Sequence, residues 1–253
     1  MFSFQIIITS NSYIVQRIDL SLCGDVLQAR HDKRVEFYRQ FIDNDALVFD
    51  VGANFGNRTV AFLELGARVI AVEPQIYCVN NIKKICGSNP KLTIVPKALG
   101  SVEGIGVMHI SNSSTLSSLS DDWIKCVKAG RFSNYRWDRD VEVQITTLDK
   151  LICDFGTPSF CKIDVEGFES NVLMGLSTPI EAVSFEFTSE FIQDAFKCIE
   201  RLSTLGNYSF NVSLAETMEY CYSDWSSSIE IVDRINNLDR KWWGDVYAKM
   251  VDI

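Results

Sequence analysis

The chain has 253 residues, of which 47% are hydrophobic and 23% charged, and its formal net charge is −9. This length and composition suit one globular unit with a large core and exclude a disordered chain. The acidic charge and the scattered basic residues argue against a nucleic-acid surface, because phosphate backbones are bound by clustered Lys and Arg.

Residues 1–45 are expected to form an N-terminal cap ahead of the main domain. Residues 4–9 and 13–18 have the composition of two strands, and residues 34–42 that of a helix. The apolar start of the chain is short and has no basic residues before it, so we expect neither a signal peptide nor a membrane span. Residues 46–253 are expected to form a single globular domain.

The pattern of a strand, a tight turn and a helix follows the cap. Residues 46–51 are an apolar run that predicts a buried strand, and a loop with Gly52 and Gly56 comes next. Glycine has no Cβ, so a ligand can approach the main chain here, and the next helix directs its free N–H groups to the same place. The following apolar strand ends at Glu73. Because neighbouring parallel strands end side by side, Glu73 is expected beside the loop, where a carboxylate can accept two hydrogen bonds from a ribose diol.

The loop differs from a dinucleotide site. A pyrophosphate is bound by G-x-G-x-x-G, and Asn54 and Asn57 stand where two of these glycines belong. A ligand with an adenosine end and no phosphate therefore fits better, and the carboxylate of Asp50 suits an ammonium or a sulfonium. An NAD(P)-dependent oxidoreductase is the weaker alternative.

The middle of the chain contains an insertion. Residues 76–86 predict a second crossover helix, and residues 92–95 predict a third strand that ends beside Glu73. Residues 104–110 alternate as a strand where a helix is expected, which indicates an inserted hairpin. Residues 111–140 show no clean period and are the natural place for substrate contacts. Four aromatic residues of this segment could stack on a sugar or pack a lid: Trp123, Phe132, Tyr135 and Trp137.

Strands and helices alternate again after the insertion. The strand at residues 160–165 ends in Asp164 and Glu166, and Gly167 breaks it before the next helix. The other expected elements are strands at 141–145, 182–187, 210–214 and 246–251, and helices at 147–153, 168–176 and 190–205. This alternation predicts an α/β fold with a mostly parallel sheet, helices on both faces, and a ligand at the carboxyl ends of the strands.

The eight cysteines show no C-x-x-C spacing. Isolated Cys residues pack as small hydrophobic side chains, so free thiols and a reducing cytoplasm are expected in place of disulfides or a metal site. The two histidines, His31 and His109, lie in no motif and are not expected to be catalytic.

Four motifs, in this order, resemble one family. They are Val48-Phe49-Asp50-Val51-Gly52-Ala53-Asn54-Phe55-Gly56 with Thr59, Val72-Glu73-Pro74, Lys97-Ala98-Leu99, and Lys162-Ile163-Asp164-Val165-Glu166-Gly167 with Glu169 and Val172-Leu173. Over about residues 45–190 the chain resembles the FkbM-type S-adenosylmethionine-dependent methyltransferases. The resemblance implies a class I methyltransferase (Rossmann-like) fold with a seven-stranded sheet and S-adenosylmethionine as the methyl donor. It also implies O-methylation of a sugar or another hydroxylated natural product, without naming that small-molecule or glycan acceptor.

The resemblance also implies where the methyl donor lies. It places the methionine end over the loop from Gly52 to Gly56, the ribose on Glu73, and Pro74 and Ala98 on the adenine side. The expected cofactor-binding residues are Asp50, Gly52, Ala53, Asn54, Gly56, Thr59, Glu73, Pro74 and Ala98.

Two acids are candidates for the chemistry. Methyl transfer is a displacement at carbon, so the acceptor oxygen must be held about 3 Å from that carbon, in line with the sulfur. A sugar hydroxyl is a weak nucleophile, and Asp164 is the first candidate for a base near it, with Glu166 the second. The two acids could instead cap the next helix, or bind a divalent cation with a third carboxylate that the sequence does not identify. No metal is assigned, and N-methylation and a non-catalytic protein on this fold stay open.

Overall fold

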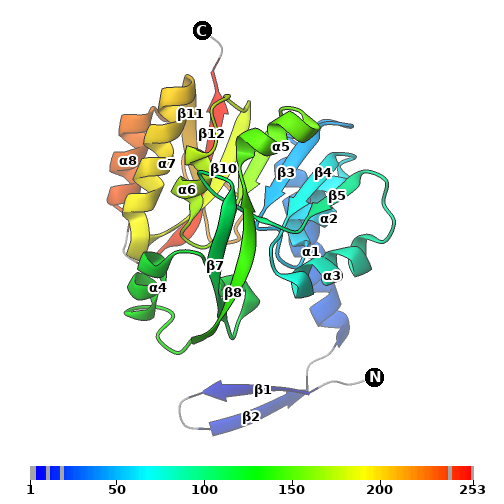
Figure 1. Ribbon diagram of the computed structural model, residues 1–253. Coiled ribbons are helices and arrows are strands. Elements are labelled where there is room, and N and C mark those ends of the chain that lie inside the picture. Colours follow the sequence, from blue (N-terminus) through cyan, green and yellow to red (C-terminus); the bar gives the residue numbers. More distant parts are fainter. Residues whose placement is uncertain (1–3, 10–11, 18–19, 239–240, 252–253) are drawn as a thin grey trace.

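Seven strands form the central sheet of the computed structural model, in the order β11-β12-β10-β9-β3-β4-β5 (Figure 1). The structure describes residues 4–9, 12–17, 20–238 and 241–251. All neighbours in this sheet are parallel except at β12, which runs antiparallel to β10 and β11. The strands are β3 Leu47–Val51, β4 Arg68–Val72, β5 Leu92–Val95, β9 Phe160–Ile163, β10 Ala182–Thr188, β11 Tyr208–Leu214 and β12 Trp243–Met250. The expected α/β fold with a mostly parallel, seven-stranded sheet is confirmed.

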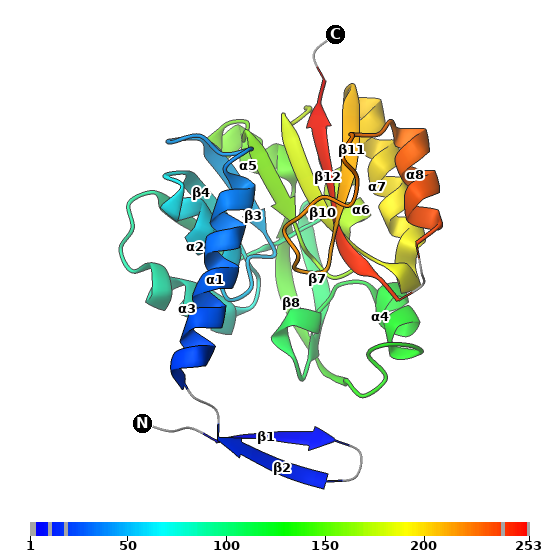
Figure 2. The same cartoon turned by 180° about the vertical axis from the view of Figure 1, so that it is seen from behind.

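Helices cover both faces of this sheet, as Figures 1 and 2 show from opposite sides. Side chains alternate along β3: Phe49 belongs to the core under α5 to α8, and Val48 belongs to the core under α1 and α2. The helices are α1 Leu20–Tyr38, α2 Asn57–Glu64, α3 Ile76–Cys86, α5 Leu148–Phe155, α6 Glu169–Met174, α7 Ile192–Leu205 and α8 Ser228–Asn236. Because both faces are covered, ligands reach the sheet at the ends of its strands.

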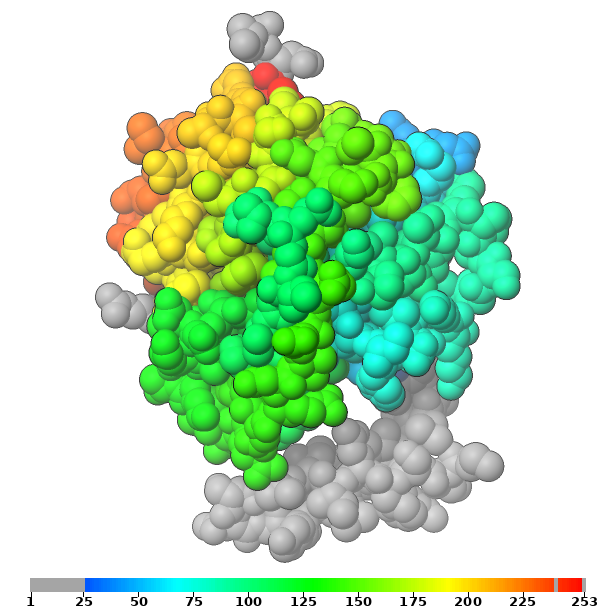
Figure 3. Space-filling model, in the orientation of Figure 1, coloured from blue at the N-terminus to red at the C-terminus, as the bar shows by residue number. Residues whose placement is uncertain are grey.

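The inserted hairpin forms a second, three-stranded sheet. It has the order β6-β8-β7, with β6 Ala98–Leu99, β7 Gly104–Ser111 and β8 Trp137–Thr146. The chain between β7 and β8 holds a short 3-10 helix, Ser114–Leu116, and α4 Asp121–Lys128. Figure 3 shows this insertion (green) forming the front of the molecule beside the cyan surface that includes α3.

The expectation that residues 111–140 are irregular is wrong in part, because α4 and the start of β8 lie within them. The side chain of Ser120 caps α4 by accepting a hydrogen bond from the main-chain N–H of Trp123. The helix has only 8 residues. A segment this short shows its apolar period over barely two turns, so the pattern was hard to recognise.

The N-terminal segment contains a β-hairpin and a long helix. Strands β1 Phe4–Thr9 and β2 Ser12–Arg17 pair antiparallel, close to the expected ranges. The helix expected at residues 34–42 is α1, which begins earlier, at Leu20, and ends at Tyr38. Side chains on its last two turns, such as Val35 and Tyr38, are buried, whereas Val26 and Leu27 are exposed. Within the described ranges, no helix has the length and apolarity to cross a membrane.

Candidate active site

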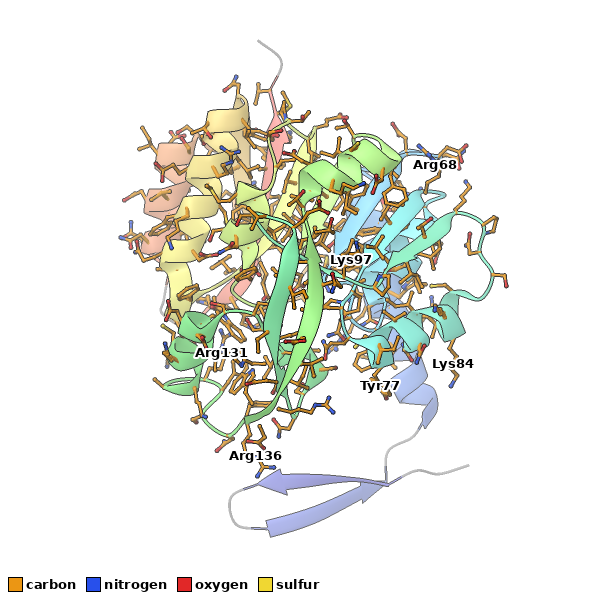
Figure 4. All side chains as sticks on the ribbon, in the orientation of Figure 1. Arg68, Tyr77, Lys84, Lys97, Arg131 and Arg136 are labelled. Carbon is orange, nitrogen blue, oxygen red and sulfur yellow. The ribbon has the colours of Figure 1, made fainter. Side chains whose placement is uncertain are left out.

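A cavity of about 400 Å³ lies at the carboxyl ends of β3, β4, β9 and β10, beneath the insertion. The turn after β5 contributes Lys97 to its wall, and the segment after α4 contributes Arg131. Figure 4 shows these two residues on either side of the β7–β8 hairpin. Among the predicted site residues, those that line the cavity are Asp50, Gly52, Ala53, Asn54, Glu73, Pro74, Ala98, Asp164 and Glu166. Gly56 and Thr59 do not line it.

The loop after β3 is tied to both neighbouring strands. The N–H groups of Gly52 and Ala53 donate to the carbonyl oxygen of Val72, at 2.9 and 3.1 Å. Gly52 has a φ of +76°, and a Cβ at this position would lie 1.8 Å from the carbonyl oxygen of Asp164. The space that Gly52 leaves open is therefore filled by the loop after β9, and not by a ligand as the sequence suggested.

Thr59 has a supporting role behind the cavity. It is fully buried on α2, and its hydroxyl donates a hydrogen bond to the carboxylate of Asp50. Burial raises the pKa of Asp50, and the hydrogen bond from Thr59 opposes that rise. Thr59 therefore orients Asp50, which lines the cavity, and does not itself contact the space where a ligand would bind.

Glu73 is held against the glycine loop. Its Oε2 accepts a hydrogen bond from the N–H of Asn54 at 2.8 Å, and its Oε1 accepts one from the N–H of Gln75 at 2.7 Å. Glu73 is 2% exposed, and this burial raises its pKa to about 7, against the opposing effect of the two main-chain bonds. Each carboxylate oxygen keeps lone pairs for further donors. The arrangement fits a vicinal diol, which is the group expected here.

Three carboxylates meet at the opposite wall of the cavity. Oxygens of Asp164, Glu166 and Glu186 lie within 4.8 Å of one another. Glu186 was not among the predicted site residues, because on β10 it stands out only as a polar residue in an apolar strand. Burial and the neighbouring charge of Asp164 raise the pKa of Glu166, and the same two causes raise that of Glu186. Burial also opposes ionisation of Asp164, but the charges of Lys162 and Arg58 outweigh it and lower the pKa.

This trio could in principle hold a divalent cation, since carboxylate oxygens are the ligands that Mg²⁺ and Ca²⁺ prefer. The third carboxylate that the sequence did not identify would be Glu186. However, the Lys162 ammonium already lies 3.3 Å from Asp164. Because an ammonium at this distance neutralises one carboxylate and repels a metal ion, these three carboxylates are a poor fit for a divalent cation.

The helix-capping alternative for Asp164 and Glu166 does not fit the geometry. The N-cap of α6 is Phe168, and no side chain caps it. The buried carboxylate of Glu169 instead accepts hydrogen bonds from the N–H groups of Val165 and Gly167, at 3.0 and 3.2 Å. These bonds hold the loop that presents Asp164 and Glu166 to the cavity.

The aromatic residues of the insertion divide into two groups. Phe132 and Tyr135 line the cavity. Trp123 is buried, and its indole N–H donates to the hydroxyl of Thr188, while that of Trp137 donates to the carbonyl oxygen of Leu116. Two of the four aromatics therefore face the cavity and two pack behind it.

The two histidines lie outside the cavity. His31 pairs with Glu64 at 2.6 Å, and His109 lies between Asp140 and Asp121 at 2.7 and 3.2 Å. Neither residue lines the cavity.

Comparison with known proteins identifies a family. A family model described as "Methyltransferase FkbM domain" matches residues 50–211. No curated protein matches the sequence.

Solved structures share the general arrangement of elements. The precorrin-6y C5,15-methyltransferase of Geobacter metallireducens GS-15 has a TM-score of 0.46 and 10% identity, with 90% of this chain and 87% of that chain covered. The O-methyltransferase TomG of Streptomyces achromogenes, solved in complex with SAM, has a TM-score of 0.44 and 6% identity, with 89% and 80% covered. A putative O-methyltransferase of Klebsiella pneumoniae has a TM-score of 0.44 and 8% identity, with 90% and 89% covered. At these values the similarities say nothing about acceptor or mechanism.

Proposed function

The chain belongs to the FkbM methyltransferase family, and on that premise we propose that it transfers the methyl group of S-adenosylmethionine to a hydroxyl of a sugar or a similar polyol. One observation carries the proposal: a single cavity has Glu73 at one end and a group of carboxylates at the other. Glu73 suits the ribose of a nucleoside, and the carboxylates suit an acceptor hydroxyl.

The donor would lie along the glycine loop. Glu73 would accept hydrogen bonds from the two ribose hydroxyls, and Asp50 would pair with the ammonium of the methionine end. Pro74 and Ala98, which also line the cavity, would hold the adenine. When bound, S-adenosylmethionine supplies an electrophilic methyl carbon, so that one O–C bond forms, one S–C bond breaks and one proton is released.

The chain's own residues handle that proton. Asp164 accepts a hydrogen bond from the acceptor hydroxyl and orients its oxygen toward the methyl group. The acidity of a hydroxyl rises steeply as its oxygen is methylated, so even a carboxylate of low pKa such as Asp164 would be able to take the proton. The raised pKa values of Glu166 and Glu186 make either of them, when ionised, a stronger base than Asp164, so that group can take the proton next.

The acceptor side of the cavity resembles a sugar site in its chemistry. Phe132 and Tyr135 offer aromatic faces, and carboxylates beside them accept hydrogen bonds from hydroxyl groups. The two arginines on this side already have partners, Arg58 with Glu216 and Arg131 with Glu190, each at 2.9 Å. A neutral, hydroxyl-rich acceptor therefore fits better than a phosphorylated one, and we propose O-methylation in place of N-methylation.

The state of the cysteines suggests a reducing compartment. The seven cysteines whose state the structure describes are free thiols. We propose a cytoplasmic enzyme whose acceptor is a small molecule or a glycan and not a nucleic acid.

Three measurements test the proposed function. Isothermal titration with S-adenosylhomocysteine is expected to give a micromolar Kd, and fluorescence titration with NADH is expected to give no binding. Radiolabelled S-adenosylmethionine is then offered with a panel of glycans and glycosides, and alkali-stable label in one of them identifies the acceptor. An absence of heat with both S-adenosyl ligands would contradict the proposal. Donor binding without transfer to any glycan or small polyol would favour a non-catalytic protein.

Removal of the two cavity aromatics is expected to affect the acceptor alone. In Phe132→Ala and Tyr135→Ala, the KM for the acceptor should rise by roughly 10-fold, because stacking of one ring on a sugar contributes about 1 to 1.5 kcal/mol. The Kd of S-adenosylhomocysteine should stay within twofold. Tyr77→Ala is a matched control, because Tyr77 is 70% exposed and does not line the cavity. A loss of donor affinity as large as the rise in the acceptor KM would mean that these rings contact the donor and not the acceptor.

Donor affinity is expected to fall in acid. The pKa of Glu73 is about 7, and a ribose diol binds its ionised form. Below that pKa the protonated form dominates, so the Kd of S-adenosylhomocysteine should be about 10-fold higher at pH 6 than at pH 8. Titrations in two buffers with different ionisation enthalpies report the released proton. In Glu73→Gln this part of the pH dependence should disappear, and its persistence would show that another group titrates.

A further inference from the structure

Lys162 lies directly beneath the cavity. Its side chain is fully buried on β9, and its Nζ has three oxygen partners. It donates to Asp245 at 2.8 Å, to Asp164 at 3.3 Å and to the carbonyl oxygen of Ile163 at 3.3 Å. Asp164 is the member of this group that also lines the cavity.

Lys162 belongs to a row of alternating charges. Glu216 contacts Arg34 at 3.3 Å and Arg58 at 2.9 Å, and Arg58 lies 3.9 Å from Asp245. The row therefore runs Arg34, Glu216, Arg58, Asp245, Lys162, Asp164. It contains as many cations as anions, so it is neutral only while Asp164, its last member, is ionised.

The row singles out one of the three cavity carboxylates. Lys162 bonds to Asp164, whereas no described cation lies within ion-pair distance of Glu166 or Glu186. Arg131, which lines the same cavity, pairs with Glu190. The positive charge is thus fixed on one side of the trio.

Stability alone is a poor reason for such a lysine. Removing an ammonium from water costs several kcal/mol, and buried ion pairs are often no more stable than apolar residues of the same size. A buried cation can instead serve the function of a site, because it fixes the charge and the orientation of a partner that faces the cavity.

We propose that Lys162, supported by Asp245, is a positioning residue that keeps the carboxylate of Asp164 charged and aimed at the acceptor hydroxyl. The inference rests on the proposed function, because it gives the acceptor-binding end of the cavity its fixed anion. Glu166 and Glu186 lack that constraint and are free to carry the proton that Asp164 passes on.

Carbon-13 NMR of protein labelled at the aspartate side-chain carboxyl tests this role. The Asp164 resonance is assigned with Asp164→Asn and followed through an acid titration in the presence of S-adenosylhomocysteine. In the unmodified protein its midpoint should lie below the ordinary 3.8. In Lys162→Met the midpoint should rise by about one unit or more, a tenfold change in the ionisation constant. Lys162→Arg should restore most of the difference.

Lys150→Met is the matched control, because Lys150 is exposed and pairs with Asp154 far from the cavity lining. It should leave the Asp164 midpoint unchanged. With the acceptor found in the glycan panel, Lys162→Met should also lower kcat at neutral pH by about 10-fold or more and leave the Kd of S-adenosylhomocysteine within about twofold.

The outcomes separate this inference from the proposed function. An unchanged Asp164 midpoint in Lys162→Met, with normal donor binding, would overturn the role of Lys162 alone. A loss of donor binding in the unmodified protein would instead overturn the proposed function. If Lys162→Met does not fold, the titration of the unmodified protein still tests the inference. An Asp164 midpoint at or above the ordinary value would contradict the role of Lys162.

Discussion

Replacing Glu73 by Ala is expected to weaken the binding of S-adenosylhomocysteine by about 100-fold or more. Two hydrogen bonds from the ribose to a charged group would be lost, and each contributes about 1.5 to 3 kcal/mol. The N–H groups of Asn54 and Gln75 would also lose their acceptor, so the loop that contacts the donor would be less well ordered. Isothermal titration at pH 8, where Glu73 is ionised, measures the loss.

Two variants distinguish the ribose contact from general damage. Glu73→Gln keeps the shape of the side chain but replaces one acceptor by a donor, so an intermediate loss of about 10-fold is expected. Glu142→Ala removes an exposed carboxylate that does not line the cavity and should leave the Kd unchanged. A Kd for Glu73→Ala within threefold of the unmodified protein would mean that the ribose lies elsewhere.

The folded state should survive the loss of Glu73. Its pKa is higher in the folded protein than the ordinary 4.5, so the folded state binds this proton more tightly than the unfolded chain. The resulting stabilisation is present at low pH and is lost as the pH rises through about 7. At pH 8 the buried carboxylate therefore costs stability, and its removal offsets the hydrogen bonds that the loop loses. Thermal unfolding at pH 8 checks that the loss of affinity in Glu73→Ala does not arise from partial unfolding of the protein.

The sequence was sufficient to predict the donor side of the cavity because that side is built locally. Asp50, Gly52 and Asn54 come from one loop, and Glu73 ends the next strand along the chain. In a parallel sheet, the rule that neighbouring strands end side by side is enough to bring them together. The helix that follows β8 was found for the same local reason, since Thr147 caps α5 by accepting from the N–H of Lys150.

The acceptor side depends on pairings that are distant in sequence. Glu186 meets Asp164 because β10 lies beside β9, and Asp245 meets Lys162 because β12 pairs with β10. No local pattern reports the order of strands in a sheet, so an isolated acid in an apolar strand cannot be assigned a partner. A Lys in such an apolar strand does predict a buried acidic partner, because Lys is almost never fully buried unless it is paired.

Helix α8 was missed although a local signal existed. Ser227 and Glu230 form a capping box, in which each side chain bonds to the main chain of the other residue. The pattern S-x-x-E just before an apolar run predicts such a start. By contrast, the first half of α1 could not be found from hydrophobic spacing, because Val26 and Leu27 on it are exposed.

Replacing Gly52 by Ala is expected to destabilise the protein and to abolish donor binding together. A left-handed conformation costs a residue with a Cβ about 1 to 2 kcal/mol. In addition, the new Cβ would lie 1.8 Å from the carbonyl oxygen of Asp164, so two main-chain loops must separate. A total loss of at least about 3 kcal/mol should lower the Tm by about 6 to 12 °C.

Gly87→Ala is the matched control for backbone conformation. Gly87 also has a positive φ, +60°, but a Cβ there would meet no atom within 4 Å. Gly87 has a ψ of −141°, so its conformation is also unfavourable for Ala, but no clash is added; the Tm of Gly87→Ala should therefore fall by less than that of Gly52→Ala. The difference between the two variants measures the contact between the donor loop and the loop that carries Asp164. Equal Tm values would show that these loops can separate freely, and that the donor and acceptor ends of the cavity are not held in register by Gly52.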